Sequence, residues 1–416
     1  MWNKNNNNKY NKFNQYNNNK FNYSRGFKKK YKNYYNSNYD GYNQNLTEEI
    51  GNTKVIKSDE EGFTGPCSNW FSNEEFFKNL PGHSDIESKK DYYFNSYSSY
   101  NIHEEMLKDR IRTGTYSDAI LQNPEIFKDK IVLDIGCGTG ILSMFAAKSG
   151  AKQVIGLEFA DIADYAKQIV KINNLEDKIT IIKSKVEEAV LPVEKVDIII
   201  SEWMGYFLLY ESMLDTVLFA RDKWLKEDGY MLPDTASITI AGIEDIDYKT
   251  SKFDFWKNVY GFDMSIFKPT CIAEPLIDIC PKERINTNSC RIFDIDLYKV
   301  KKEELDFSSK YSLKFNRNND YFSGLVAWFE TGFTKLNKKF NLNTSPYLKG
   351  THWQQTVFYT KNDIPVRSGD VVEGSIAVRK SETNFRQLDI KISYNVKYDG
   401  KDEDKERQWV QMYKIV

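Results

Sequence analysis

The chain has 416 residues, of which 40% are hydrophobic and 28% are charged, proportions typical of a globular protein with room for two or three domains. No apolar run approaches the roughly 20 residues of a membrane helix, and the N-terminus lacks the apolar stretch of a secretory signal. Five widely spaced cysteines without a Cys-x-x-Cys pair, and only three histidines, argue against a disulfide framework and a zinc site. We therefore expect no membrane span, no metal, and a location in the cytoplasm and nucleus.

The formal net charge of −1 hides an asymmetry along the chain. Residues 1–45 hold nine Lys or Arg and one Asp, about +8, so the body carries about −9. This segment is rich in Asn, Lys and Tyr and contains no Leu, Ile or Val, which predicts a disordered tail. A basic tail with interleaved aromatics can contact nucleic acid, but a solvated tail is the simpler interpretation. The acidic body favours basic partners.

Residues 46–90 are predicted to be a linker with one short helix that ends before Pro81-Gly82. Cys67 and His83 resemble part of a zinc finger, but two ligands do not make a site.

A first structured domain is expected over residues 91–232. Ile102, Met106 and Ile111 have the spacing of one charged helix. Strands and helices then alternate, with strands at 131–135, 154–158, 179–183 and 196–201 and helices at 141–149, 165–173 and 213–225. Buried β-branched runs alternating with amphipathic helices predict a parallel, doubly wound α/β sheet.

The rhythm changes at Pro233-Asp234. Strands with turn residues between them are expected at 237–240, 291–297, 325–329, 356–359, 374–378 and 388–396. They predict an antiparallel barrel or sandwich over residues 233–416, with the aromatic stretch 253–267 as an excursion.

The first strand of the α/β domain leads into a glycine loop, Gly136-Cys-Gly138-Thr-Gly140. A glycine loop alone is a weak signal because many nucleotide-binding folds have one. This loop has Ile141 where a dinucleotide fingerprint would have its third glycine, which argues against a dinucleotide. Asp134 precedes it, where a carboxylate would repel a pyrophosphate and attract an amine. Glu158 ends the second strand, where an acid can accept both ribose hydroxyls. The pattern favours a cationic adenosine ligand over a phosphate, although polar residues at strand ends can also be purely structural.

Five segments together resemble the motifs of protein arginine N-methyltransferases, in particular the type I branch that makes asymmetric dimethylarginine. They are Asp91–Tyr97, Ile102–Met106, Val132–Gly140, Ser201–Tyr206 with Tyr210–Met213, and Thr351–Trp353. The resemblance runs from Asp91 to the C-terminus. It implies a Rossmann-like domain that binds S-adenosylmethionine, followed by a β-barrel domain with a dimerisation arm at about 245–280.

The resemblance also implies roles for single residues. Those around the cofactor are His103 and Arg112 at its methionine end with Asp134, Gly136 and Gly138, Glu158 at the ribose, and Glu187 at the adenine amino group. Tyr97 would lie beside the substrate arginine. Arginine/glycine-rich proteins and histone tails are the implied substrates, and a homodimer or larger homo-oligomer is the implied assembly.

Glu202 and Glu211 are the expected catalytic acids. A guanidinium offers five N–H donors in a planar fork, which two carboxylates can bind from two sides. Localising its positive charge on the bound nitrogens leaves a lone pair on the nitrogen that faces the methyl donor. Glycosidases also use paired acids but need no adenosine site, and pairing with internal arginines is the structural alternative.

Four further positions follow from the same motifs. His352, with Trp353 beside it, is expected to orient the acids or relay a proton, although a hydrogen-bonded core histidine is the ordinary alternative. Met106, Met213 and Trp353 are expected to shape the substrate pocket, although methionines are most often core residues.

Two other functions stay open from the sequence. A methyltransferase for nucleic acids or small molecules is one, against which the absence of an Asn-Pro-Pro-Tyr-like motif argues. A non-catalytic scaffold that binds basic proteins is the other, against which the retained acids argue.

Overall fold

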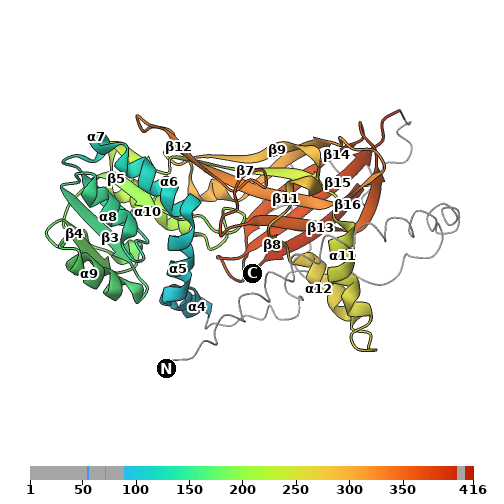
Figure 1. Cartoon of the computed structure of the whole chain (residues 1–416), viewed down its shortest axis with the longest axis horizontal. Helices are drawn as coiled ribbons and strands as arrows, with labels where there is room; N and C mark the ends of the chain where they lie inside the picture. The colour runs from blue at the N-terminus through green and yellow to red at the C-terminus, as the bar shows by residue number, and fades with distance from the viewer. Residues whose placement is uncertain (1–53, 56–70, 72–88, 401–407) are drawn as a thin grey trace, which may run out of the picture. The chain divides into compact units, whose positions relative to one another are not determined.

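The computed structural model describes residues 54–55, 71, 89–400 and 408–416 (Figure 1). The expected disordered tail over residues 1–45, and nearly all of the expected linker with its short helix, lie outside these residues. Within the described part of the chain, no helix is both long and apolar enough to cross a membrane.

Residues 131–232 form a parallel sheet in the order β4–β3–β2–β5–β6. Its strands are β2 (Ile131–Ile135), β3 (Gln153–Glu158), β4 (Ile179–Lys183), β5 (Val196–Ser201) and β6 (Leu225–Leu232). The connections contain α8 (Ile141–Lys148), α9 (Ile162–Ile172), the 3-10 helix η3 (Val186–Glu188) and α10 (Met213–Trp224). The predicted parallel α/β fold is confirmed. The strand order reverses between β2 and β5, and ligands bind at the carboxyl edge of such a reversal.

Among the described residues, four helices precede this sheet: α4 (Lys89–Tyr97), α5 (Tyr100–Lys108), α6 (Arg110–Leu121) and α7 (Pro124–Phe127). The prediction of one helix through Ile102, Met106 and Ile111 was wrong, because the helix is interrupted at Asp109. Asp109 adopts φ −67° and ψ 97°, and its side chain accepts hydrogen bonds from the backbone N–H groups of Ile111 and Arg112. It therefore ends α5 and caps the start of α6.

The second domain consists of two antiparallel sheets. One has the order β1 (Lys54–Val55), β16 (Gln408–Ile415), β15 (Leu388–Lys397), β14 (Val371–Lys380), β10 (Phe307–Lys314). The other has the order β8 (Leu276–Asp278), β13 (Gln355–Val366), β11 (Asp320–Phe333), β7 (Thr235–Ile243), β9 (Ile285–Asp296), with β12 (Phe340–Asn343) paired to β11. A β-bridge between Thr287 and Phe315 joins the two sheets. The result is the expected barrel-like domain.

A helical excursion leaves this domain between β7 and β8 (Figure 1). It contains α11 (Ile246–Phe253), the 3-10 helices η4 (Asp254–Lys257) and η5 (Ser265–Phe267), and α12 (Lys268–Ala273). These elements occupy most of the segment 245–280, which we call the arm.

The turn between β11 and β12 attaches the second domain to the first. The Asn123 side chain accepts a hydrogen bond from Lys338 N (2.7 Å) and donates one to Lys338 O (3.0 Å). The Tyr116 and Phe333 rings meet edge to face at 5.1 Å. These contacts join the β11–β12 turn and the end of β11 to helix α6 and to Asn123, which follows it.

Candidate active site

The glycine loop follows β2 and requires backbone conformations that favour glycine. Gly136, Gly138 and Gly140 have φ angles of 66°, 53° and 82°. A Cβ at Gly136 would lie 2.3 Å from Cε of Met213, so the Met213 side chain covers the loop. Because the three glycines carry no side chains of their own, a ligand can approach the loop backbone closely.

Glu158, at the end of β3, accepts hydrogen bonds from Gly138 N (3.0 Å) and Ala160 N (2.8 Å). Burial raises the pKa of its carboxyl group, although these backbone bonds oppose the shift. The structure thus places the predicted ribose acid directly against the glycine loop.

Asp134 is fully buried beneath the loop, and its Oδ2 accepts a hydrogen bond from Ser143 Oγ (2.6 Å). Its Oδ1 is buried without a hydrogen-bond partner in the part of the chain that the structure describes. Burial raises the pKa of this carboxyl group to about 7. An unpaired buried carboxylate oxygen is costly alone and suits a cationic or hydrogen-donating ligand, so these residues fit S-adenosylmethionine.

His103 lies beside the glycine loop, whereas Glu187 contacts helix α10. A Cβ at Gly138 would lie 3.1 Å from Cε1 of His103, and His103 Nε2 lies 2.8 Å from the carbonyl oxygen of Tyr97. His103 therefore lies beside the loop. The exposed Glu187, in η3, accepts a hydrogen bond from Thr216 Oγ1 (2.9 Å) on α10.

Glu202 follows β5, on the other side of the strand reversal. Its Oε2 receives Arg112 Nε and Nη2, each at 2.7 Å, and both side chains are more than 90% buried. The pairing with an internal arginine, which the sequence left as the structural alternative, therefore exists. Arg112 also donates to the carbonyl oxygen of Met106 (3.3 Å). Arg112, expected at the cofactor, is thus paired with Glu202 and with the α5–α6 junction.

Glu211 lies in the loop between β5 and α10. Its Oε2 accepts a hydrogen bond from Tyr97 Oη at 2.9 Å. Burial, with a further contribution from the charge of Glu202, raises the pKa of Glu211 to about 7. The two predicted acids are thus electrostatic neighbours with different partners, one a cation and the other a neutral phenol.

The loop that carries Glu211 has an unusual backbone. Phe207, Leu208, Glu211 and Ser212 all have positive φ, and Gly205 N donates to Leu208 O at 3.0 Å. Such conformations persist only where the surroundings impose them.

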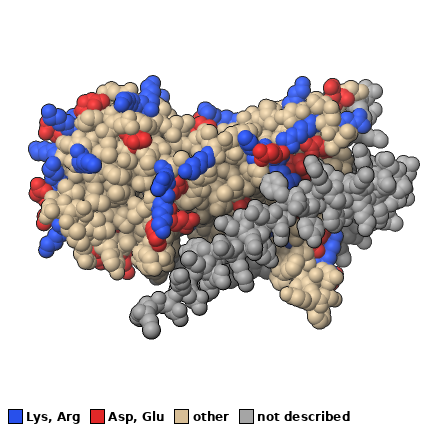
Figure 2. Space-filling model, viewed as in Figure 1, with Lys and Arg blue, Asp and Glu red and all other residues tan. Residues whose placement is uncertain are grey.

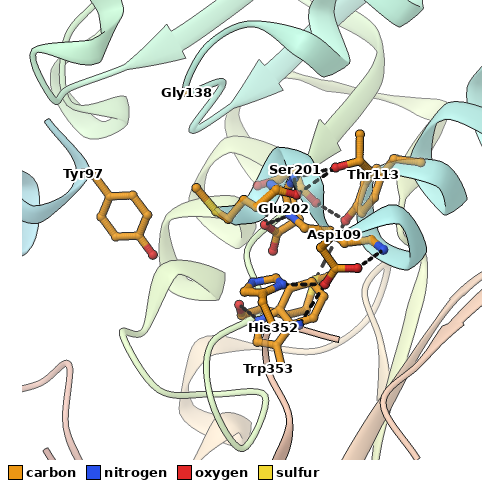
Figure 3. Close-up of polar contacts among 12 residues, drawn as sticks. Tyr97, Asp109, Thr113, Gly138, Ser201, Glu202, His352 and Trp353 are labelled. Atoms are coloured by element: carbon orange, nitrogen blue, oxygen red, sulfur yellow. Dashed lines mark hydrogen bonds and ion pairs between the residues drawn. The ribbon is translucent and has the colours of Figure 1, made fainter. Parts of the chain in front are cut away.

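His352 does not contact either acid through a hydrogen bond. Its Nδ1 lies 2.8 Å from Oδ2 of Asp109, and its backbone N donates to the same oxygen at 2.9 Å (Figure 3). Burial raises the pKa of Asp109, but the hydrogen bonds from His352 and Arg112 prevail and lower it to about 2. The neighbouring Trp353 donates to the carbonyl oxygen of Met204 (2.8 Å), which anchors the loop after β5. Direct orientation of the acids by His352 is therefore not what this geometry shows.

Two residues of the site escaped the sequence reasoning. Asp109 joins His352 to the start of α6, and its position before a second helix start was the available signal. Arg386 contacts the backbone of Glu211 from a loop 175 residues away, a contact that no local sequence pattern indicates. Tyr97 was anticipated; Figure 3 shows it across the site from Asp109.

Among the described residues, no group of three or more His, Cys, Asp or Glu side chains is arranged to hold a metal ion. A parallel sheet, a glycine loop flanked by acids, and buried carboxylates across the strand reversal define a methyltransferase that uses S-adenosylmethionine.

Comparison with known proteins identifies the branch. Residues 234–400 match the family model for the arginine methyltransferase oligomerization subdomain, and residues 118–230 match the model for ribosomal protein L11 methyltransferase. Protein arginine N-methyltransferase 1 of Schizosaccharomyces pombe is 56% identical over 305 residues, covering 73% of this chain and 89% of the relative. The Chlamydomonas reinhardtii protein of the same name is 53% identical over 304 residues, covering 73% and 88%.

A solved structure agrees with these relatives. The PRMT1 enzyme–prozyme heterotetrameric complex with AdoHcy from Trypanosoma brucei has a TM-score of 0.73 at 45% identity, covering 77% of this chain and 100% of that chain. The chain belongs to the protein arginine N-methyltransferase family. It is an S-adenosylmethionine-dependent enzyme of the type I branch, which forms mono- and asymmetric dimethylarginine.

Proposed function

We propose that Glu202 and Glu211 bind the guanidinium group of a protein arginine and direct one of its nitrogens toward the methyl donor. The observation that supports this most is the pair of buried neighbouring carboxylates, each with one oxygen already held by an internal partner. Arg112 and Tyr97 fix the direction of the two acids, so little reorganisation is needed when an arginine arrives.

The cofactor residues divide the task. Glu158 and the glycine loop would hold the ribose side, and Asp134 with His103 would hold the amino-acid end. When bound there, S-adenosylmethionine supplies an electrophilic methyl group. Glu202 and Glu211 concentrate the positive charge of the guanidinium on two nitrogens, which leaves electron density on the third. Proximity of the two bound groups then supplies much of the rate.

Met106, Met213 and Trp353 line or support this pocket. Met213 covers Gly136, and Trp353 anchors the loop between the acids through Met204. These contacts support a role for Met213 in limiting the space at the methyl donor, and the backbone of Met106 supports Arg112.

Incubation with methyl-labelled S-adenosylmethionine and an arginine/glycine-rich peptide tests the proposal. We expect label on arginine, and mono- and asymmetric dimethylarginine by mass analysis and chromatography. Label on a nucleic acid instead would indicate another methyltransferase class. Peptide binding without any transfer would indicate a scaffold.

A homodimer or larger assembly through the arm belongs to the same proposal. The arm carries exposed apolar side chains, among them Tyr260 (98% exposed), Phe262 (69%) and Ile266 (82%). Figure 2 shows its tip, at the lower right, as largely uncharged surface. Exposed apolar clusters of this kind mark interaction sites, and the matching family model is described as an oligomerization subdomain.

Arginine/glycine-rich proteins and histone tails are the proposed substrates, because both present cationic segments to an acidic body. A location in the cytoplasm and nucleus is proposed with them. The free cysteines Cys137, Cys271, Cys280 and Cys290 support a reducing compartment.

A further inference from the structure

The loop between β14 and β15, residues 381–387, reaches from the barrel domain to the active-site loop. It is attached to its own sheet by Lys414, whose Nζ donates to Ser381 Oγ (3.0 Å) and lies 3.7 Å from Asp389 Oδ1. Gln387 N donates to Asn384 O at 2.8 Å, and Ser381 N donates to Gln387 O at 2.9 Å. The loop is therefore an anchored and internally bonded element.

Arg386 of this loop contacts Glu211 twice through the backbone. Glu211 N donates to Arg386 O at 2.8 Å, and Arg386 Nη1 donates to Glu211 O at 2.7 Å. The next residue, Ser212, donates its hydroxyl to Phe385 O. Glu211 and Ser212 have φ angles of 76° and 57°, a backbone conformation that is costly for residues other than glycine. The hydrogen bonds with Arg386 and Phe385 hold these two residues in it.

The same guanidinium covers an aromatic residue of the N-terminal helix. Its Cζ lies 3.6 Å from the ring centroid of Tyr93 and 5.2 Å from that of Phe94, both on α4. Tyr97, on the last turn of α4, donates to the Glu211 carboxylate. Arg386 thus joins the helix that presents Tyr97 to the loop that presents Glu211.

We infer that Arg386 is a positioning residue for methyl transfer, which holds Glu211 in its strained backbone conformation and couples helix α4 to it. The inference rests on the proposed function of Glu211. Because Arg386 binds the backbone carbonyl of Glu211, it provides a nearby positive charge without occupying the carboxylate oxygens. The planar fork suits this double task, since it donates in its plane while its face lies on a ring, which a lysine cannot reproduce.

The charges around Glu211 make a second readout available. Tyr93 and Tyr97 face it from α4, Glu202 and Tyr206 from its own loop, and Arg386 from the β14–β15 loop. The positive charge of Arg386 lowers the pKa of Glu211 against the effect of burial. Without that charge, Glu211 keeps its proton to higher pH, so the acid limb of the pH profile of kcat/KM shifts to higher pH.

The test compares Arg386→Gln, Arg386→Lys and the control Glu382→Gln with the wild-type enzyme on an arginine/glycine-rich peptide. Glu382 lies in the same loop and pairs only with Arg379 in the contacts of the described residues. We expect kcat to fall roughly tenfold to a hundredfold in Arg386→Gln, as for loss of a charge-assisted hydrogen bond that holds the backbone of Glu211. Arg386→Lys should be intermediate, and Glu382→Gln should stay within about twofold of wild type.

The pH profile separates positioning from general stability. In Arg386→Gln the acid limb of the kcat/KM profile should move to higher pH. A merely structural role would lower kcat/KM at every pH and leave the position of the acid limb unchanged. Should Arg386→Gln not fold, Arg386→Lys tests the planar fork alone: it keeps the positive charge, so its kcat should fall while its acid limb stays in place, and a wild-type kcat in folded Arg386→Lys would overturn the inference. A folded Arg386→Gln enzyme with wild-type kcat and an unmoved acid limb would overturn the inference. An inactive wild-type enzyme would instead count against the proposed function itself.

The link to α4 has its own measurement. If Arg386 acts through Tyr93, the losses of Arg386→Gln and Tyr93→Leu should combine to less than their product in the double variant. Losses that multiply would show that α4 is not coupled through this contact.

Discussion

Glu202 and Glu211 are the same residue type, nine positions apart, yet their surroundings differ. Glu202 is paired with a buried arginine, whereas the Glu211 carboxylate is held by a neutral phenol and a backbone-bound guanidinium lies nearby. Burial therefore dominates at Glu211 and raises its pKa to about 7.

Replacement of each acid by glutamine should slow methyl transfer by about 3–4 kcal/mol, roughly a hundredfold to a thousandfold, because the charge that localises the guanidinium is lost. The two variants should differ in stability. Glu202→Gln leaves Arg112 buried without its counter-charge, so its free energy of unfolding should fall by about 3 kcal/mol. Glu211→Gln removes a carboxylate whose folded pKa, about 7, lies above its ordinary 4.5. Ionisation of Glu211 costs stability as pH rises through that value, so this variant should hold or gain stability above pH 7.

Turnover, affinity for the cofactor and thermal unfolding, measured on both variants, decide this prediction. Affinity for S-adenosylmethionine should barely change. Two variants that melt early but still methylate at near wild-type rates would refute the catalytic assignment of the acids.

Asp109→Asn should weaken both the start of α6 and the position of His352. Asparagine can still cap a helix, but it loses the charge that the His352 and Arg112 bonds stabilise. Because the folded pKa, about 2, lies below the ordinary 3.8, Asp109 stabilises the fold above pH 4, and this contribution disappears as pH falls toward 2. We expect a loss of about 1–2 kcal/mol in denaturant unfolding near neutral pH that shrinks with acidification. Asp118→Asn, on the same helix and exposed, is the matched control; a pH-independent difference for Asp109→Asn would exclude the ionic explanation.

At the scale of elements, the loop between β5 and α10 is held by one hydrogen bond of its own and by contacts from two loops of the barrel domain. Trp353 binds Met204 at its start, Gly205 binds Leu208 within it, and Arg386 binds Glu211 near its end. Its run of positive φ angles is a strained shape that no residue of the loop would adopt alone. The barrel domain therefore shapes the loop with the predicted acid Glu211, which belongs to the α/β domain in sequence.

Gly205→Ala tests how far catalysis depends on that shape. A Cβ at Gly205 would lie 2.0 Å from the carbonyl oxygen of Tyr210, so the loop must move. We expect kcat to fall at least about tenfold, while affinity for S-adenosylhomocysteine by calorimetry changes little, because the glycine loop is untouched. Gly114→Ala, in α6 with nothing within 4 Å of the added Cβ, should instead stabilise the protein by about 0.5–1 kcal/mol. Equal kcat in Gly205→Ala and wild type would show that the loop tolerates a different shape.

The sequence predicted β2, β3 and β5 because they are short, mostly buried runs, and β4 because it is rich in β-branched residues, although two of its five residues are exposed. Both signals are local in the sequence. It did not predict β6, whose residues Lys226, Glu227 and Asp228 are charged and exposed, so the strand depends on pairing with β5. The break at Asp109 was missed because the apolar spacing continues through it. The acids were found through their motif, but the partner of each, Arg112 or Tyr97, is fixed by packing between segments some 90 or 114 residues apart.

At the scale of the whole molecule, the described site is shared between the two domains. The α/β domain supplies the glycine loop and both acids, and the barrel domain supplies His352, Trp353 and Arg386. Neither domain alone contains the contacts that fix Glu211 and Asp109. A change in the barrel domain that displaces His352, Trp353 or Arg386 should therefore change the geometry of Glu211 and Asp109 in the α/β domain.

Assembly through the arm is the prediction at this scale. Replacing Tyr260, Phe262 and Ile266 together by serine should leave the fold intact, because these side chains are 98%, 69% and 82% exposed. It should remove the apolar surface that we propose a second copy covers, so sedimentation should report monomers, and methylation should fall at least about tenfold with them. The matched control, Tyr260→Phe with Phe262→Leu and Ile266→Val, keeps apolar area at the same positions and should keep both assembly and activity. An unaltered assembly in the triple-serine variant would show that the arm is not the contact, whereas active monomers would show that assembly is not needed for a site whose described contacts all lie within one chain.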